Sequence, residues 1–226
     1  MEIASVTLMT KEIDLLRRFY TEWLGFTEIE REGGEELSIR IGSGVLRFLE
    51  EKKDREPFYH FAFNIPSNQF KEAKGWVGDK VSLNTEGVQD EILFERLGGC
   101  SFYISDPVGN IVEFIAREHS PRQSGPFCMQ TLLNISEMSL TVSHVLEASE
   151  ELQRIGLTSR DNDPIHRAYL NFMGDDGSDC YLLLVESGRR WIFSDKVSEV
   201  HPLELVVNNI GIITVDEQGR LTVVQT

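Results

Sequence analysis

Hydrophobic and polar residues alternate along several short segments of the chain, which is the pattern of half-buried β-strands. One such strand covers Ile3–Met9, and it is followed by a helix whose apolar and aromatic side chains recur at helical spacing until Gly25. Three more short strands follow, at 26–30, 36–41 and 44–49. The N-terminal part of the chain therefore predicts a β-α-β-β-β unit.

The same order of elements recurs further along the chain. A second copy begins with the alternating segment Tyr59–Ile65 and continues through a helix around Phe70–Val77. It ends with strands at 92–94, 100–104 and 111–116. Two consecutive copies of one unit indicate a fold built from repeated βαβββ modules.

Beyond these copies the pattern repeats once more and then only in part. The third copy has a strand at 135–142, a helix at 145–155 and a hairpin formed by 168–173 and 180–186. The fourth copy opens at 201–207, after which the hydrophobic pattern leaves only two short strands. The sequence therefore predicts an α+β protein whose C-terminal copy is shortened.

A polar segment separates the second copy from the third. Residues 119–134 contain Ser120-Pro121 and Gly125-Pro126, dipeptides that mark loops and interrupt the hydrophobic period. We therefore predict two domains, 1–118 with two modules and 135–226 as a shortened second domain, joined by a linker at 119–134.

Composition narrows the classes of function. The 226 residues include 37 acidic and 22 basic side chains, which gives a net charge of −15 and argues against nucleic acid as a partner. No apolar run approaches the roughly 18 residues of a membrane span, and the N-terminus lacks a basic leader. The three cysteines are widely spaced, which indicates neither a disulfide framework nor a thiolate zinc site. We therefore expect a cytoplasmic protein with no membrane or nucleic-acid partner.

Three motifs resemble one known superfamily. The opening strand Ile3–Leu8 precedes an aromatic helix that ends in Trp23-Leu24-Gly25-Phe26. The second module carries His60-Phe61-Ala62-Phe63, and then Phe102-Tyr103-x-x-Asp106-Pro107-x-Gly109-Asn110-x-x-Glu113. In these motifs the chain resembles the vicinal oxygen chelate superfamily, which includes glyoxalases, fosfomycin- and bleomycin-resistance proteins and extradiol dioxygenases. The resemblance implies curved, cup-like mixed β-sheets with helices packed outside.

The resemblance also implies where a metal ion would bind. In the superfamily the ion lies in a cup between two paired modules, and the first and last strands of the modules supply its ligands. The corresponding positions are Ser5, His60, Glu137 and His201 on first strands, and Arg47, Glu113 and Leu183 on last strands. The implied ligands are therefore His60, Glu113 and Glu137, and the implied cofactor is a divalent ion such as Fe, Mn, Zn or Ni.

One departure from the superfamily pattern affects this site. Ser5 stands where the first histidine ligand is expected, and a serine hydroxyl is a poor replacement for imidazole. Glu137 would complete the ligand set if modules pair between the two domains, as in swapped members of the superfamily. Its placement depends on aligning Ile135–Leu140 with Ile3–Leu8, and a slip of one residue would turn Glu137 to the opposite face of its strand.

Two further residues are candidates for the reaction or for substrate binding. Tyr103 stands ten residues before Glu113, as a tyrosine does in ring-cleaving oxygenases, which implies a catalytic role in hydrogen bonding or proton transfer. The histidine that this pattern expects upstream is missing, because Phe94, Glu95 and Arg96 occupy its window. Arg47 is the candidate substrate-binding residue for an anionic group, although it could also pair with Glu113 or reach solvent.

Three functions are compatible with these residues. The first is a metal-dependent enzyme that acts on a small molecule with vicinal oxygens and resembles extradiol, catechol-type dioxygenases or glyoxalases. The second is a metal-free protein of the bleomycin-resistance type that binds and sequesters a small molecule. The third is a degenerate member with interactions only. We expect a monomer or a homodimer, because four modules in one chain can supply the pairing that shorter relatives obtain by dimerising.

Overall fold

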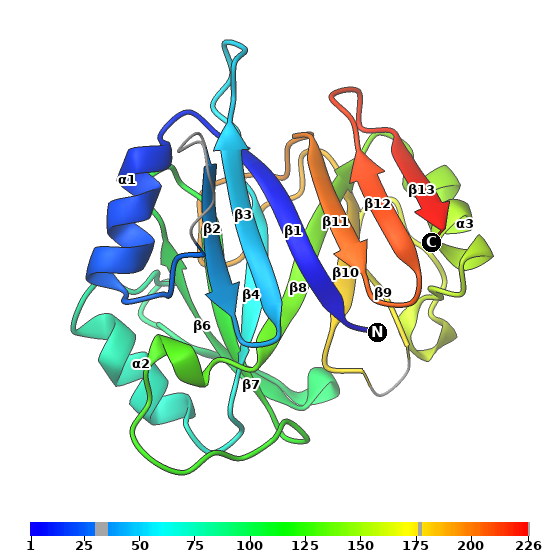
Figure 1. Ribbon diagram of the computed structural model, residues 1–226. Helices are drawn as coiled ribbons and strands as arrows, with labels where there is room; N and C mark the ends of the chain where they lie inside the picture. Colours follow the sequence, from blue (N-terminus) through cyan, green and yellow to red (C-terminus); the bar gives the residue numbers. More distant parts are fainter. Residues whose placement is uncertain (30–35, 176–177, 226) are drawn as a thin grey trace.

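The computed structural model describes residues 1–29, 36–175 and 178–225, and within them the chain forms two mixed β-sheets with few helices (Figure 1). The strands are β1 (Ile3–Thr10), β2 (Glu36–Ile41), β3 (Gly44–Glu50), β4 (His60–Ile65), β5 (Ile92–Phe94), β6 (Gly99–Ser105), β7 (Ile111–Arg117), β8 (Asn134–Val142), β9 (Asn171–Met173), β10 (Tyr181–Glu186), β11 (Leu203–Val207), β12 (Gly211–Val215) and β13 (Leu221–Gln225). The helices are α1 (Ile13–Arg17), which continues as a π-helical segment over Arg18–Trp23, α2 (Phe70–Gly78) and α3 (Val145–Arg154).

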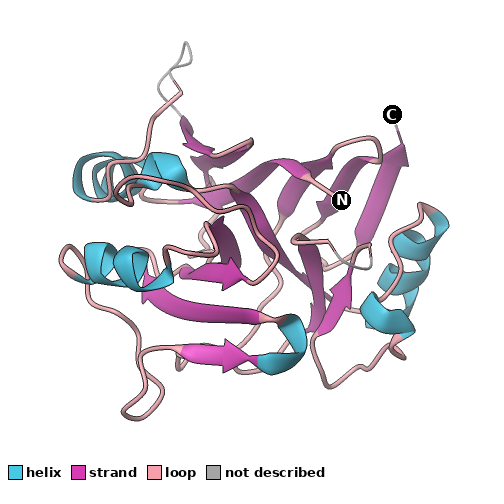
Figure 2. Ribbon diagram, turned by 90° about the horizontal axis from the view of Figure 1, so that it is seen from below, coloured by secondary structure: helices cyan, strands magenta, loops and turns pink. Residues whose placement is uncertain are grey.

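Among the described residues, one sheet has the order β13-β12-β11-β1-β3-β2 and the other has the order β5-β6-β7-β4-β8-β10-β9. In each of the first three modules the first strand runs parallel to the last, as β1 does to β3, β4 to β7 and β8 to β10. Figure 2 shows helices on both sides of the strands. The predicted α+β class, with curved mixed sheets and helices outside them, is confirmed.

The modules pair across the predicted linker. β1 pairs antiparallel with β11, and β4 pairs antiparallel with β8. The first and fourth modules therefore share the six-stranded sheet, and the second and third share the seven-stranded sheet. The division into domains 1–118 and 135–226 stays a prediction, and both sheets contain strands from each side of it.

The main hydrophobic core joins the two sheets. Side chains alternate between the faces of a strand, so Phe61 and Phe63 of β4 face this core while His60 and Ala62 face the opposite side. Phe63 lies 5.9 Å from the ring of Phe26, measured between ring centroids. The opposite face of the seven-stranded sheet is therefore free to carry polar chemistry.

The segment predicted as a strand at 26–30 forms only an isolated bridge, between Glu28 and Ile39. Residue 30 lies outside the described residues. The cause is Phe26, whose N–H donates to the Tyr20 carbonyl at 2.9 Å and whose ring packs against the Tyr20 ring at 5.6 Å. These contacts hold the start of the segment against the preceding helical turn instead of along the sheet.

The turn motif between β6 and β7 fixes the start of β4. Asp106 accepts a hydrogen bond from the Tyr20 hydroxyl at 2.9 Å and another from the Asn110 side-chain amide at 2.7 Å. Asn110 in turn accepts from the Tyr59 N–H at 2.8 Å, immediately before His60. These polar residues of the motif therefore hold His60 in position.

The described residues contain no helix that is both long and apolar enough to cross a membrane.

Candidate metal centre

Three neighbouring strands bring His60, Glu113 and Glu137 together. β7, β4 and β8 are adjacent in the sheet, and Ala62 of β4 pairs with Glu113 on one side and with Glu137 on the other. His60 lies two residues before Ala62 and therefore on the same face of the strand. One ligand atom from each of the three side chains lies within 4.8 Å of the other two, and all three residues are buried.

Glu137 occupies the same strand position in the third module that His60 occupies in the second module. Ala62 pairs with Glu113, and the corresponding partners in the third module are Ser139 and Leu183. Glu137 precedes Ser139 by two residues, just as His60 precedes Ala62. The alignment that predicted Glu137 therefore has the register of the structure, and the fourth position of this cup is the apolar Leu183.

The environment of His60 keeps its imidazole neutral and oriented. Its Nδ1 donates to the carbonyl oxygen of Ile111 at 3.2 Å, which leaves the Nε2 lone pair free, 3.5 Å from a carboxylate oxygen of Glu113. Burial lowers the pKa of His60 to about 4, and the positive charge of Arg189 contributes in the same direction. A neutral imidazole whose second nitrogen donates to the backbone is the usual form of a metal-ligating histidine.

The two carboxyl groups are buried close to each other. Burial raises the pKa of Glu113 to about 8, and the negative charge of Glu137 adds to this rise. Burial also raises the pKa of Glu137, and this effect is opposed by the guanidinium of Arg117, which pairs with its carboxylate. Arg117 donates a second hydrogen bond, to the Ser136 hydroxyl at 3.1 Å.

This donor set fits a divalent cation. One imidazole and two carboxylates suit ions such as Fe(II) or Mn(II), and a set of three protein ligands leaves coordination positions open for substrate. Burial and the charge of Glu137 both disfavour the ionised form of Glu113, so a cation between the two carboxyl groups would oppose both effects and favour ionisation. Leu183 supplies no ligand and leaves its side of the cup apolar.

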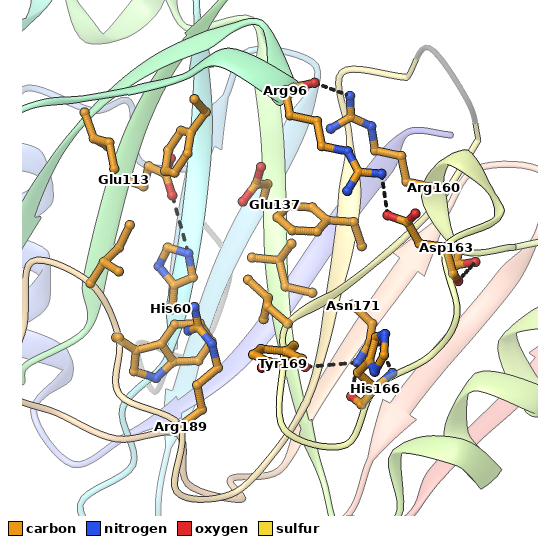
Figure 3. A pocket seen from close by; sticks show the side chains of 18 of the residues that line it. His60, Arg96, Glu113, Glu137, Arg160, Asp163, His166, Tyr169, Asn171 and Arg189 are labelled. Carbon is orange, nitrogen blue, oxygen red and sulfur yellow. Dashed lines mark hydrogen bonds and ion pairs between the residues drawn. The ribbon is translucent and has the colours of Figure 1, made fainter.

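The three residues lie at a pocket of about 830 Å³ (Figure 3). Its aromatic lining residues are Phe94, Tyr103, Tyr169, Phe172 and Trp191. Its charged lining residues outside the triad are Glu95, Arg96, Arg160, Asp163 and Arg189. The pocket therefore combines apolar walls with a small set of polar groups, as small-molecule sites commonly do.

Tyr103 lies beside the triad. It is paired with Glu113 across the β6–β7 ladder, and its ring centroid is 6.3 Å from that of His60. Its ring stacks on Phe193 at 4.8 Å. Burial raises the pKa of Tyr103 well above its usual value, and the charges of Glu113 and Glu137 add to the rise. The phenol therefore keeps its proton, and its hydroxyl donates a hydrogen bond to the Glu113 carboxyl group.

Arg47 and Ser5 lie on the other sheet. Arg47, on β3, lies 3.3 Å from the Ser38 hydroxyl and 3.5 Å from the Thr7 hydroxyl, and it is not part of the pocket lining. Ser5 is on β1 and belongs to the six-stranded sheet. The structure therefore does not bring Arg47 together with His60, and Glu137 takes the position that the expected pairing of the first two modules would give to Ser5.

Three residues of the site are absent from the sequence prediction. Arg117 stands four residues after Glu113 on the same strand and so on the same face, a spacing that signals a partner for a buried carboxylate. Arg189 and Trp191 lie in the connection between the third and fourth modules, where no hydrophobic period marks a position. Their presence in the pocket depends on the path of that loop.

Comparison with known proteins supports this fold. A sequence model described as toxoflavin-degrading enzyme matches residues 135–189. The structure resembles that of a candidate dioxygenase from Bacillus subtilis subsp. subtilis str. 168, with a TM-score of 0.56 and 15% identity, over 81% of this chain and 63% of that one. No curated protein matches the sequence.

Two smaller solved structures match about half of the chain. Lactoylglutathione lyase from Agrobacterium tumefaciens matches with a TM-score of 0.40 and 20% identity, over 50% of this chain and 91% of that one. The fosfomycin resistance protein FosX from Listeria monocytogenes, complexed with Mn(II) and a dihydroxypropylphosphonic acid, matches with a TM-score of 0.39 and 20% identity, over 51% of this chain and 89% of that one. Together with the sheet topology, the similarity to the Bacillus protein shows the vicinal oxygen chelate fold.

Proposed function

We propose that this vicinal oxygen chelate protein is a metal-dependent enzyme that acts on a small molecule carrying two adjacent oxygen atoms. The observation that carries the proposal is the convergence of His60, Glu113 and Glu137 within 4.8 Å at the pocket. The match of residues 135–189 to the toxoflavin-degrading enzyme model supports a degradative reaction on a small molecule. The similarity to the Bacillus candidate dioxygenase supports oxygenase chemistry.

In this proposal His60, Glu113 and Glu137 hold a divalent ion, which when bound acts as a Lewis acid on the substrate oxygens. The Ile111 carbonyl fixes the ring of His60, and Arg117 orients the carboxylate of Glu137. Tyr103 donates its phenolic proton toward the substrate. His60, Glu113 and Glu137 are buried, so the polar contacts among these groups are stronger than they would be in solvent.

Metal analysis tests the proposal directly. Wild-type protein is stripped with chelator, reloaded in turn with Fe(II), Mn(II), Zn(II) and Ni(II), and desalted before its metal content is measured. We expect one ion per chain in wild type and a loss of bound metal in His60→Ala and Glu137→Gln. His144→Ala is the matched control, because this exposed histidine lies beyond the end of β8, immediately before α3, and does not line the pocket. Wild type that takes up none of the four ions would refute metal dependence.

The reaction class is tested on the metal-loaded protein. Catechols with Fe(II) under oxygen probe ring cleavage, toxoflavin probes the degradation named by the family model, and hemithioacetals probe glyoxalase-type isomerisation. Tyr103→Phe removes the proton donor while keeping the ring that stacks on Phe193. We expect a lower kcat with unchanged metal content for this variant, by ~10²-fold or more if Tyr103 is the acid or base.

A metal-free binding protein is the second candidate function. It is favoured by the ion pair of Arg117 with Glu137 and by the contact of His60 with Glu113, because these give the buried groups partners from the protein itself. Ligand binding that is the same in chelated and metal-loaded protein, with no turnover, would support this candidate. A monomer or homodimer remains our prediction for the oligomeric state.

A further inference from the structure

The loop between β10 and β11 has a fixed base. The N–H of Gly188 donates to the Ser198 carbonyl at 2.8 Å, and the N–H of Ser198 donates to the Arg189 carbonyl at 2.7 Å. The Ser198 hydroxyl is buried, accepts from the Arg189 N–H at 3.0 Å and donates to the Glu186 carbonyl at 2.8 Å. Arg189 therefore leaves the sheet from a held backbone position.

The same loop is anchored to the second module. Arg190 pairs with Glu86 at 2.5 Å, and the other carboxylate oxygen of Glu86 accepts from the Phe193 N–H at 2.8 Å. The ring of Trp191 lies 4.8 Å from the imidazole of His60. Arg189, Trp191 and Ile192 of this loop therefore line the pocket beside the triad.

Arg189 differs from the other arginines that line the pocket. Arg96 pairs with Asp163 at 2.6 Å, and Arg160 lies 3.6 Å from Asp161. Within the described residues Arg189 has no carboxylate within 4.0 Å, and the hydrogen bond of its guanidinium goes to the Arg190 carbonyl at 3.2 Å. Its charge is thus not neutralised by the protein.

The guanidinium of Arg189 is also partly withdrawn from water. It lies 5.3 Å from the centre of the Trp191 ring, and burial lowers its pKa. A cation in this situation gains more from an anionic partner than an exposed one does, and a guanidinium pairs with a carboxylate through two parallel hydrogen bonds.

The charge of Arg189 acts within the candidate site. Figure 3 shows its side chain beside His60, at the same end of the pocket. The Trp191 ring connects the two groups, because its centroid lies 4.8 Å from that of the His60 imidazole and 5.3 Å from the Arg189 guanidinium carbon. An anion on Arg189 would therefore lie next to the group that holds the ion in the proposed function.

We propose that Arg189 binds an anionic oxygen group of the substrate, so that the substrate is a small carboxylate-bearing molecule. In this inference the substrate's two adjacent oxygens point toward His60, and that orientation rests on the proposed function. The inference also explains how a protein with a net charge of −15 would accept an anion, because Arg189 supplies a local positive charge inside the pocket.

Two probes that differ only by a carboxylate test this inference. Binding of 3,4-dihydroxybenzoate and of catechol is measured by calorimetry, in Mn(II)-loaded and in chelated protein. We expect wild type to bind 3,4-dihydroxybenzoate at least about tenfold more tightly than catechol. Arg189→Gln should remove most of this preference, and Arg189→Lys should retain part of it. Arg154→Gln is the matched control and should keep the preference, because this exposed arginine of α3 pairs with Glu151 and does not line the pocket.

The outcomes separate the two proposals. Wild type that shows no preference for the carboxylate, or Arg189→Gln protein that is folded by circular dichroism and keeps the full preference, overturns the role of Arg189. A preference that depends on Arg189 in chelated protein, in a chain that takes up no metal, upholds the role of Arg189 while the proposed metal dependence fails. Mn(II) binding without any preference for the carboxylate upholds the proposed metal dependence and overturns the role of Arg189.

Discussion

Replacing Arg117 with methionine tests how the buried charges of the site are balanced. Arg117 and Glu137 form an ion pair in which each side chain is 4% exposed. Removing one partner of a buried ion pair costs ~3–5 kcal/mol, because the other charge stays buried and uncompensated. Methionine retains much of the length of the side chain, so the change is mainly one of charge. For a chain of this size we expect Tm of the metal-free protein to fall by about 6–20 °C.

The same variant predicts a rescue by metal. Without Arg117, a divalent ion supplies the positive charge that Glu137 lacks, so added Mn(II) should raise Tm more in Arg117→Met than in wild type. Saturation at ~100 times Kd stabilises a folded protein by ~2.7 kcal/mol, and a tighter Kd in the variant increases this gain. Calorimetric melts with and without Mn(II) measure this gain in Tm. Arg96→Met is the control, because the Arg96 side chain is 67% exposed. A variant that melts within about 2 °C of wild type in chelator would refute the reasoning.

Metal binding should depend on pH through Glu113, whose pKa of about 8 in the metal-free protein means that an ion must displace a proton at neutral pH. Affinity for Mn(II) should therefore weaken by up to about tenfold per pH unit as pH falls below 8. His60 should contribute little to this change, because its pKa is about 4. Mn(II) titrations at several pH values measure the dependence, and an affinity that does not change with pH contradicts it. At the β2–β3 turn, Gly42→Ala would put a Cβ 2.0 Å from the Leu133 carbonyl oxygen, whereas Gly25→Ala, also at positive φ, would meet nothing within 4 Å. Urea denaturation should show a larger loss of stability for Gly42→Ala than the ~1 kcal/mol expected from backbone strain alone at Gly25, and equal losses would contradict the close approach.

The parts of the site that lie within one module are predictable from sequence. The spacing of His60 and Glu113 fixes their relation, because a module always places its first strand parallel to its last strand. Glu137 follows from the same rule applied to the third module. Local periodicity and turn residues determine these positions, and both can be recognised in the amino-acid sequence.

Module pairing is a different matter, because it depends on contacts between distant segments. Ser5 and Glu137 occupy equivalent strand positions, and the alternating pattern around each would allow either to face His60. The choice is made by sheet edges and core packing, which local sequence does not encode. The structure therefore does not place Arg47 in the cup that the sequence predicts for it. The sequence favours a solvated rim for the doublet Arg189-Arg190, because its loop follows no period, whereas Arg189 lines the pocket.

The pairing of β1 with β11 sets the order in which the chain can fold. All strands of the seven-stranded sheet lie between His60 and Glu186, so a nascent chain can complete that sheet before β11 has left the ribosome. At that stage β1 is paired with β3 on one side only. Its other edge is open, because that edge pairs with β11, which begins at Leu203. An unpaired, largely apolar edge strand is a template for wrong association. Docking of the last module closes this edge through a contact between residues about 200 positions apart, and such long-range pairing raises the contact order, which slows folding.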